Sequence, residues 1–458
     1  MASSNLNFIR AARLLTLGIA LGSSFSATSG QRAEAPVTSA ERYVEFCGAG
    51  SAGIAKTPLD CSHALEIGPA EASHVVILLS GLAEGAAMLL PVARYISGAV
   101  PDTQVWAVER REQNLADFSE FGTAAALEYY LNGHYRHETP QAAAYARHWG
   151  LATSLSDLRI VVGAARGVAG RRVFLGGHSW GATTALAYAA WDFDGHPGYW
   201  DLAGLILIDG GVHDSFAGEG FKFRLTVGDT EKMLARINGG DIFTADIAGL
   251  WRLPGRPEQV PLFYQLAAQC AVSDPHGPSK LQNLLPQVMQ PAVSVSNSAL
   301  LGWLIDTHAP LADFQAHSGH LDDRTVGAHD WISDGPASID VIAAAFAGDR
   351  PAGLEWYWPR RMSLDLEAID PFVASAVTKG LGLSLEHASD IDIPLYAFAT
   401  GITHGSAISA AKWVVANSKI PEATYVTDES MSHLDPLFDA PPDNKFLQTV
   451  TSFLTSQQ

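Results

Sequence analysis

Positive charge is scarce in this sequence of 458 residues. Its 29 lysines and arginines stand against 48 aspartates and glutamates, which gives a formal net charge of −19. Such a surplus of negative charge repels nucleic-acid phosphates and anionic membrane surfaces, so we expect no nucleic-acid partner. The sequence is 47% hydrophobic and 17% charged, a composition typical of a globular protein.

Cysteine is also scarce, with three residues in the whole chain. Their spacing matches no cysteine-based metal motif. Cys47 and Cys61 are close in sequence, in a region compatible with an antiparallel hairpin, and we predict a disulfide between them in an oxidising compartment. Cys270 has no neighbouring histidine and is interpreted as a buried structural thiol.

Long apolar runs are missing as well: no stretch reaches the 18 residues that would indicate a membrane-spanning helix. Near the N-terminus, Arg10 and Arg13 precede a shorter apolar run over 14–21, which small residues follow. This order is typical of a secretory signal peptide. We therefore expect a signal peptide over 1–30, cleaved after Ser26 or a nearby small residue. The mature protein would be secreted or periplasmic, without stable membrane insertion.

Short, continuously apolar segments recur along the chain and alternate with helix-like segments. Runs of this length predict strands that are buried on both faces, as in a parallel sheet. The alternation predicts an α/β fold with helices on both faces of a mostly parallel sheet. The expected strands cover 75–79, 105–108, 173–176, 205–208, 395–399 and 424–426, and the expected helices 88–98, 154–167, 182–191 and 444–456.

One long interval, from Asp209 to Ile393, contains no convincing buried strand and is rich in tryptophan, phenylalanine, histidine and proline. We interpret it as a large, mainly helical cap or lid inserted after the sixth strand. The expected organisation is an N-terminal part of the core over 31–215, the cap over 216–390, and a C-terminal part of the core over 391–458.

A G-x-S-x-G motif runs from Gly177 to Gly181, with Ser179 at its centre. It follows an apolar strand and opens an alanine-rich helix, which is the context in which this motif presents a nucleophilic serine. Glycines two residues before and after the serine avoid clashes at a strained strand-to-helix corner. The first amides of the helix point towards developing negative charge. We predict that Ser179 is a nucleophile.

Together these features resemble the α/β-hydrolase superfamily, and in particular its esterase-like and lipase-like serine hydrolases. The resemblance covers about 40–215 and 390–455. In this family a carboxylic acid and then a histidine follow the nucleophile along the chain. His433 lies after the last apolar strand and before the C-terminal helix. The resemblance therefore implies that His433 is the catalytic base.

The acid departs from the commonest pattern of the family. Most members carry it after the strand that corresponds to 395–399, yet the turn over 400–405 contains no carboxylate. Asp209, at the end of the strand over 205–208, occupies a position that some lipases of the family use. We predict Asp209 as the acid. The alternatives left open are Asp428, Glu429 and Asp214.

By resemblance, the oxyanion hole would consist of the backbone amides of Leu82 and Trp180. The expected function is hydrolysis of a small-molecule carboxylic ester that has an apolar portion, without any cofactor. One alternative is a secreted aminopeptidase of the prolyl-aminopeptidase type, which would need acidic cap residues to hold the substrate amine. The other is a non-catalytic binding protein on a hydrolase fold.

Two further groups of polar residues have a functional and a structural interpretation. Glu109, Arg110 and Arg111 follow a predicted strand, where internal ion pairs are favoured over binding of a substrate carboxylate. A histidine-rich and aspartate-rich stretch of the cap has no recognisable metal spacing, and a solvated loop is favoured over a metal site. Its members are His317, His320, Asp322, His329 and Asp330.

Overall fold

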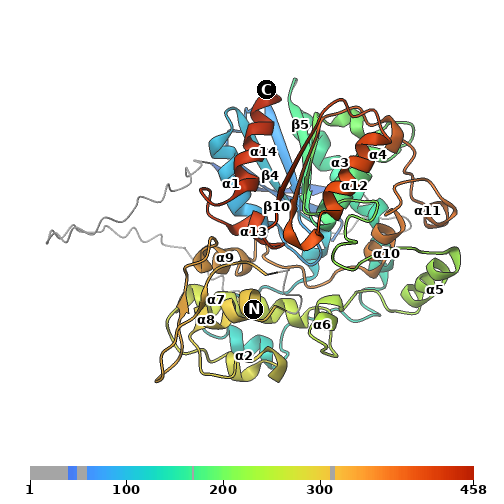
Figure 1. Ribbon diagram of the computed structural model, residues 1–458. Helices are drawn as coiled ribbons and strands as arrows, with labels where there is room; N and C mark the ends of the chain where they lie inside the picture. Colours follow the sequence, from blue (N-terminus) through green and yellow to red (C-terminus); the bar gives the residue numbers. More distant parts are fainter. Residues whose placement is uncertain (1–39, 49–58, 168–169, 310–314) are drawn as a thin grey trace, which may run out of the picture. The chain divides into compact units, whose positions relative to one another are not determined.

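The computed structural model describes residues 40–48, 59–167, 170–309 and 315–458. The expected signal peptide over 1–30 lies outside the described residues and stays a prediction. The described chain is organised around one sheet of eight strands (Figure 1).

The strand order of this sheet is β1-β2-β4-β3-β5-β6-β9-β10. Strand β2 is antiparallel to both of its neighbours, β1 and β4, whereas the remaining neighbours pair in parallel. Each of the six apolar segments expected to be a strand lies in this sheet, which confirms the mostly parallel α/β architecture. The strands are β1 (Glu41–Cys47), β2 (Cys61–Ile67), β3 (His74–Leu79), β4 (Thr103–Glu109), β5 (Arg172–His178), β6 (Gly204–Ile208), β9 (Leu395–Thr400) and β10 (Ala423–Asp428).

Helices cover both faces of the sheet because alternate residues of its central strands point to opposite faces. On β3, Val76 and Leu78 belong to the same hydrophobic cluster as the apolar faces of α1 and α14. Val75 and Ile77 belong to the cluster that α3, α4 and α12 complete (Figure 1). These helices are α1 (Leu90–Ala99), α3 (Leu151–Arg166), α4 (Trp180–Ala190), α12 (Ser406–Ala416) and α14 (Lys445–Ser456).

The first two strands form an antiparallel pair whose register places Cys47 opposite Cys61. A disulfide joins these two residues. Cys270 is a free cysteine on α7 (Gln259–Ser273) and is only partly buried, in contrast to the buried thiol expected from the sequence. Partial burial still raises the pKa of its thiol to about 11. A thiol with so high a pKa is poorly suited to nucleophilic chemistry, in line with its interpretation as a structural residue.

Between β6 and β9, none of the described residues joins the eight-stranded sheet. This stretch contains a two-stranded sheet, β7 (His320–Leu321) with β8 (Trp331–Ile332), and several helices. Among the described helices, none is long and apolar enough to cross a membrane. The helices of the stretch are α5 (Val227–Asn238), α6 (Asp246–Leu250), α7, α8 (Asn297–Gly302), α9 (Ile339–Phe346), α10 (Arg360–Ala368) and α11 (Ala376–Leu381); two further short helices of the chain are α2 (Ala126–Leu131) and α13 (Asp435–Phe438).

Candidate active site

Ser179 occupies the sharp corner between β5 and α4, with φ 55° and ψ −125°. This positive φ is strained for a residue with a side chain, and such strain is typical of functional positions. Gly177 and Gly181 make the corner possible. A Cβ on Gly177 would lie 2.3 Å from the carbonyl carbon of Gly181, and one on Gly181 would lie 2.3 Å from the carbonyl oxygen of Leu79.

His433 lies in the loop between β10 and α13, and its side chain is buried. Its Nδ1 is 2.6 Å from Oδ2 of Asp209, which directly follows β6 and is fully buried. Thr400, at the end of the adjacent β9, donates its amide to Oδ1 and its hydroxyl to Oδ2 of Asp209, each at 2.7 Å. Because β6 and β9 are parallel neighbours, their carboxyl ends meet here.

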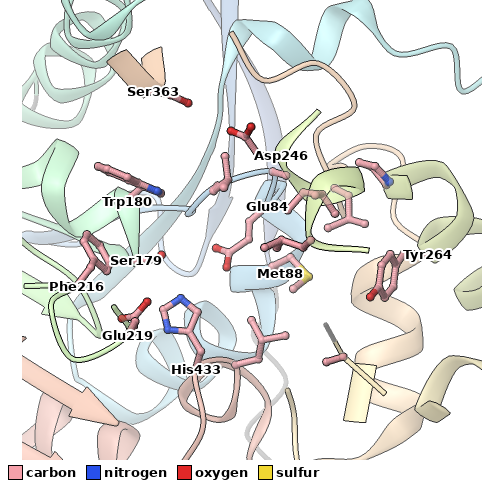
Figure 2. A pocket seen from close by; sticks show the side chains of 18 of the residues that line it. Glu84, Met88, Ser179, Trp180, Phe216, Glu219, Asp246, Tyr264, Ser363 and His433 are labelled. Atoms are coloured by element: carbon pink, nitrogen blue, oxygen red, sulfur yellow. The ribbon is translucent and has the colours of Figure 1, made fainter. Parts of the chain in front are cut away.

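The same strand end brings this pair next to the serine. The Ser179 amide donates to the carbonyl of Ile208 at 2.9 Å, and a Cβ on Gly210 would lie 2.2 Å from the Ser179 carbonyl oxygen. Ser179 and His433 both line one cavity, and Figure 2 shows them on the same side of it. The structure therefore brings Ser179, His433 and Asp209 together.

The charges of the histidine and the acid follow from their surroundings. Burial lowers the pKa of His433, and the neighbouring His178 lowers it further, against the opposing effect of Asp209. Burial alone would raise the pKa of Asp209, but hydrogen bonds from His433 and Thr400 hold it below its usual value. A neutral imidazole beside an ionised carboxylate is the arrangement that general-base chemistry requires.

The other acids considered from the sequence lie in different surroundings. Asp214 forms a salt bridge of 2.5 Å with Arg224. Asp428 accepts hydrogen bonds from the amide and hydroxyl of Ser430, and Glu429 is exposed. The carboxylate that the structure places against Nδ1 of His433 is that of Asp209.

The two amides expected to bind an oxyanion flank Ser179. Trp180 is the first residue of α4, and the first amides of a helix have no acceptor within it. Leu82 lies in the loop after β3 and lines the same cavity as Ser179. In the described part of the chain, the Leu82 amide has no hydrogen-bond acceptor. Both amides are thus available to a ligand.

Arg110 fixes the loop after β3 from outside the cavity. Its guanidinium donates to the carbonyls of Ser80 at 2.8 Å, Gly81 at 2.9 Å and Glu84 at 3.2 Å, and it forms a salt bridge of 2.8 Å with Glu355. The internal ion-pair interpretation therefore fits Arg110 better than binding of a substrate carboxylate.

Its neighbours also form internal interactions. Arg111 is buried and forms salt bridges with Asp60 and Asp157. Glu109 accepts a hydrogen bond from the amide of Ala352. These contacts tie β4 to other segments of the chain and do not face the cavity that contains Ser179.

The histidine-rich stretch of the proposed cap does not converge on one point. Its members interact with separate partners, in the pairs His317–Asp435, His320–Asp334, His329–Asp322 and Asp330–His276. Within the described residues, one group has metal-ligand spacing, Glu45 with Cys47 and Cys61, but both of these sulfurs are in the disulfide. A sulfur in a disulfide does not supply the thiolate that binds metal.

Two functional neighbours of the site were missed in the sequence. His178, within the G-x-S-x-G motif, is fully buried, and its Nδ1 is 2.9 Å from Oε1 of Glu84. Glu84 lies in the loop after β3 and lines the cavity. His178 lies within the G-x-S-x-G motif and Glu84 lies two residues after Leu82, but no sequence signal pairs two residues 94 positions apart.

The cavity in front of Ser179 has a volume of about 350 Å³ and a wall that is largely apolar. Residues between β6 and β9 supply most of this wall, together with the loop after β3 (Figure 2). Four carboxylates also reach it, whereas His433 is the one lining residue, among those described, that can carry positive charge. The aromatic lining residues are Trp180, Phe216, Phe221, Phe223, Trp251, Tyr264 and Phe346, and the acidic ones are Glu84, Glu219, Asp246 and Glu367.

Comparisons with known proteins bear on the fold. No family model matches the sequence, and no curated protein matches it. Among solved structures, a candidate lipase from Sulfolobus solfataricus is similar over 94% of this chain and 98% of its own, with a TM-score of 0.52 and 16% identity. With the strand order above, this similarity shows that the chain has the α/β-hydrolase fold, as the resemblance implied.

Two other solved structures match at lower TM-scores. An epoxide hydrolase from an endophytic Streptomyces has a TM-score of 0.41 and 16% identity, covering 91% of this chain and 94% of its own. A thermophilic esterase from Thermogutta terrifontis has a TM-score of 0.37 and 14% identity, covering 91% and 99%.

Proposed function

We propose that this protein is a serine hydrolase that cleaves a carboxylic ester through an acyl-enzyme. Ser179 attacks the carbonyl carbon while His433 takes its proton, and Asp209 orients and stabilises the imidazolium that forms. The amides of Leu82 and Trp180 stabilise the oxyanion, each worth about 10²–10³ in turnover. His433 then protonates the leaving alcohol, and water releases the acid by the same steps.

The observation that carries this proposal is the hydrogen bond of 2.6 Å between Asp209 and His433, beside a strained serine that opens into an apolar cavity. A cavity of about 350 Å³ suits a small ester with an apolar acyl or alcohol group. We further propose that residues 216–390 act as the cap that shapes this cavity. Export of the protein after removal of residues 1–30 remains part of the proposal, and the N-terminal mass of the mature protein tests it.

Labelling with a fluorophosphonate probe tests the nucleophile directly. We expect the wild type to be labelled at Ser179 and Ser179→Ala to lose both labelling and hydrolysis of p-nitrophenyl esters, by up to about 10⁶-fold in turnover. Ser363→Ala is a matched control, because Ser363 lines the same cavity. Equal labelling of the Ser179→Ala variant would refute the proposal, and labelling of neither protein would favour the non-catalytic binding protein.

A second candidate is the aminopeptidase, because acids line the cavity. Glu219, Asp246 and Glu367 all come from the proposed cap. Burial and the nearby carboxylate of Asp246 raise the pKa of Glu367 to about 7, so a substrate ammonium would relieve an unfavourable environment. Aminoacyl p-nitroanilides with a free or an acetylated amine separate the two candidates. Preference for the free amine that Glu367→Gln abolishes would favour the aminopeptidase.

A further inference from the structure

A second carboxylate–histidine pair lies directly beside the proposed triad. Glu84 is 7% exposed and His178 is fully buried. The Nδ1 atom of His178 is 2.9 Å and 3.1 Å from the two carboxylate oxygens of Glu84. On the other side of the ring, its Nε2 is 2.8 Å from the backbone carbonyl oxygen of His433.

The hydrogen-bond partners determine where the protons of this pair are. A carbonyl oxygen only accepts, so Nε2 of His178 carries a proton and donates it to His433. Oε2 of Glu84 already accepts the amide of Gly81 at 2.6 Å. Burial alone would favour neutral groups, yet each partner stabilises the charge of the other: the pKa of His178 is raised and that of Glu84 is lowered. Because both ring nitrogens of His178 face oxygen acceptors, we assign the pair as an imidazolium and a carboxylate.

Three segments of the proposed active site meet at this pair. Glu84 and Gly81 belong to the loop expected to supply an oxyanion donor, His178 directly precedes Ser179, and the carbonyl belongs to His433. The imidazolium ring also lies close to the base, because the ring centroids of His178 and His433 are 4.3 Å apart. Movement of either partner would disturb all three segments.

We propose that Glu84 and His178 form a positioning pair, which holds the oxyanion loop and the base loop against the nucleophile and keeps a positive charge beside His433. This inference rests on the proposed hydrolase function. Neither residue is a reacting group. Their role is to fix the backbone positions of the reacting groups and the electrostatic environment of the base.

Several other charged groups lie near the Glu84–His178 pair and contribute to the electrostatic environment of His433. Asp209 faces His433 from the end of β6, and Glu219 lines the cavity that contains His433. Arg110 and Glu355 lie behind the loop of Glu84 and pair with each other. None of these groups is altered by substitution of His178, so its loss removes the positive charge next to the base and leaves the negative ones.

The test compares His178→Gln, Glu84→Gln and Glu84→Asp by the pH dependence of kcat/KM with a p-nitrophenyl ester. Without the adjacent cation, His433 binds its proton more tightly. The acidic limb of the kcat/KM profile, where activity falls as His433 becomes protonated, should therefore shift to higher pH by about one unit in His178→Gln. Glu84→Gln should give the same direction, because a buried imidazolium without its carboxylate loses its proton. The shift should be smaller than in His178→Gln, because the negative charge of Glu84, which raises the pKa of His433, is lost as well. Glu84→Asp keeps the charge and should leave the limb near its wild-type position. In the two glutamine variants kcat should fall by about 10- to 100-fold, with little change in KM.

The matched control is Asp157→Asn, which removes the charge of a buried carboxylate paired with Arg111, away from the cavity. It should lower the melting temperature without moving the limb. The double variant Glu84→Gln/His178→Gln should be no slower than the slower single variant, because the two residues act as a unit.

An acidic limb that stays in place in both glutamine variants would overturn the inference, as would single effects that multiply in the double variant. Should one glutamine variant fail to fold, the other and Glu84→Asp still decide the limb position. Failure of the proposed function looks different, because wild-type protein would then show neither probe labelling nor ester hydrolysis that depends on Ser179.

Discussion

Replacement of Asp209 by asparagine should disable the proposed base with little change in shape. The amide of Thr400 donates to Oδ1 of Asp209, so the oxygen of an asparagine at this position must face Thr400. Its NH2 group then faces Nδ1 of His433, where the carboxylate now accepts. A donor in that place forces the proton of His433 onto Nε2, and this tautomer cannot take a proton from Ser179.

The expected loss of activity in Asp209→Asn is estimated from two free-energy costs. Turning the amide so that its oxygen faces His433 brings NH2 against the Thr400 amide, and an unsatisfied buried donor costs about 1–3 kcal/mol. The imidazolium formed in the reaction also loses its buried carboxylate partner, which costs about 3–5 kcal/mol. Together these costs of about 4–8 kcal/mol correspond to a fall in kcat of roughly 10³- to 10⁶-fold.

The assay is kcat for a p-nitrophenyl ester, with Asp214→Asn and Asp428→Asn as controls. Asp214 pairs with Arg224 instead of His433, and Asp428 accepts from Ser430, so both variants should keep activity close to wild type. Activity of Asp209→Asn within tenfold of wild type would refute the assignment of the acid. A large loss in either control variant, with Asp209→Asn active, would move the acid to that residue.

Three further predictions follow from the same structure. Burial lowers the pKa of His433, so the base is neutral at lower pH than an ordinary histidine; kcat/KM should keep its plateau below about pH 6.5, and an acidic limb above that pH would contradict this. Replacement of Cys61 by serine removes the disulfide to Cys47 and should lower the free energy of unfolding in urea by about 2–3 kcal/mol, an effect that a reducing agent should reproduce in the wild type. Gly181→Ala would place a Cβ 2.3 Å from the Leu79 carbonyl oxygen and should cost about 1–3 kcal/mol of stability and reduce probe labelling of folded protein; unchanged labelling would mean that the corner tolerates a side chain.

Most of the fold could be predicted from the sequence because its signals are local. Six of the eight strands of the sheet contain short apolar runs, and the glycines around Ser179 are required by a single backbone corner. The choice of Asp209 came from the resemblance to lipases of the family, and a carboxylate at this place reaches the turn after 395–399 only where the strands ending at Asp209 and Thr400 are neighbours. The observed pairing of β6 with β9 provides that neighbourhood, although the catalytic role of Asp209 stays a prediction.

The lining of the cavity could not be predicted in the same way. Glu219, Asp246 and Glu367 come from separate segments between β6 and β9, where no regular period indicates which side chains face inward. The sequence therefore left the acids required by an aminopeptidase unlocated. Their convergence on the cavity depends on how the helices of that region pack, which is a property of tertiary structure and not of local pattern.

Glu84 and His178 indicate a functional role only as a pair, so neither residue could be assigned one from the sequence alone. A lone carboxylate in the loop that is expected to supply an oxyanion donor would repel the negative charge that develops on the substrate. A lone buried imidazole next to the base would remain neutral, because burial disfavours its charged form. Only the pair gives a locally balanced charge with the imidazolium beside His433, whose ring centroid is 4.3 Å from that of His178. His178 is therefore matched to Glu84 in the loop after β3. Substitution of either residue alone should lower kcat by more than the small change in side-chain volume would suggest.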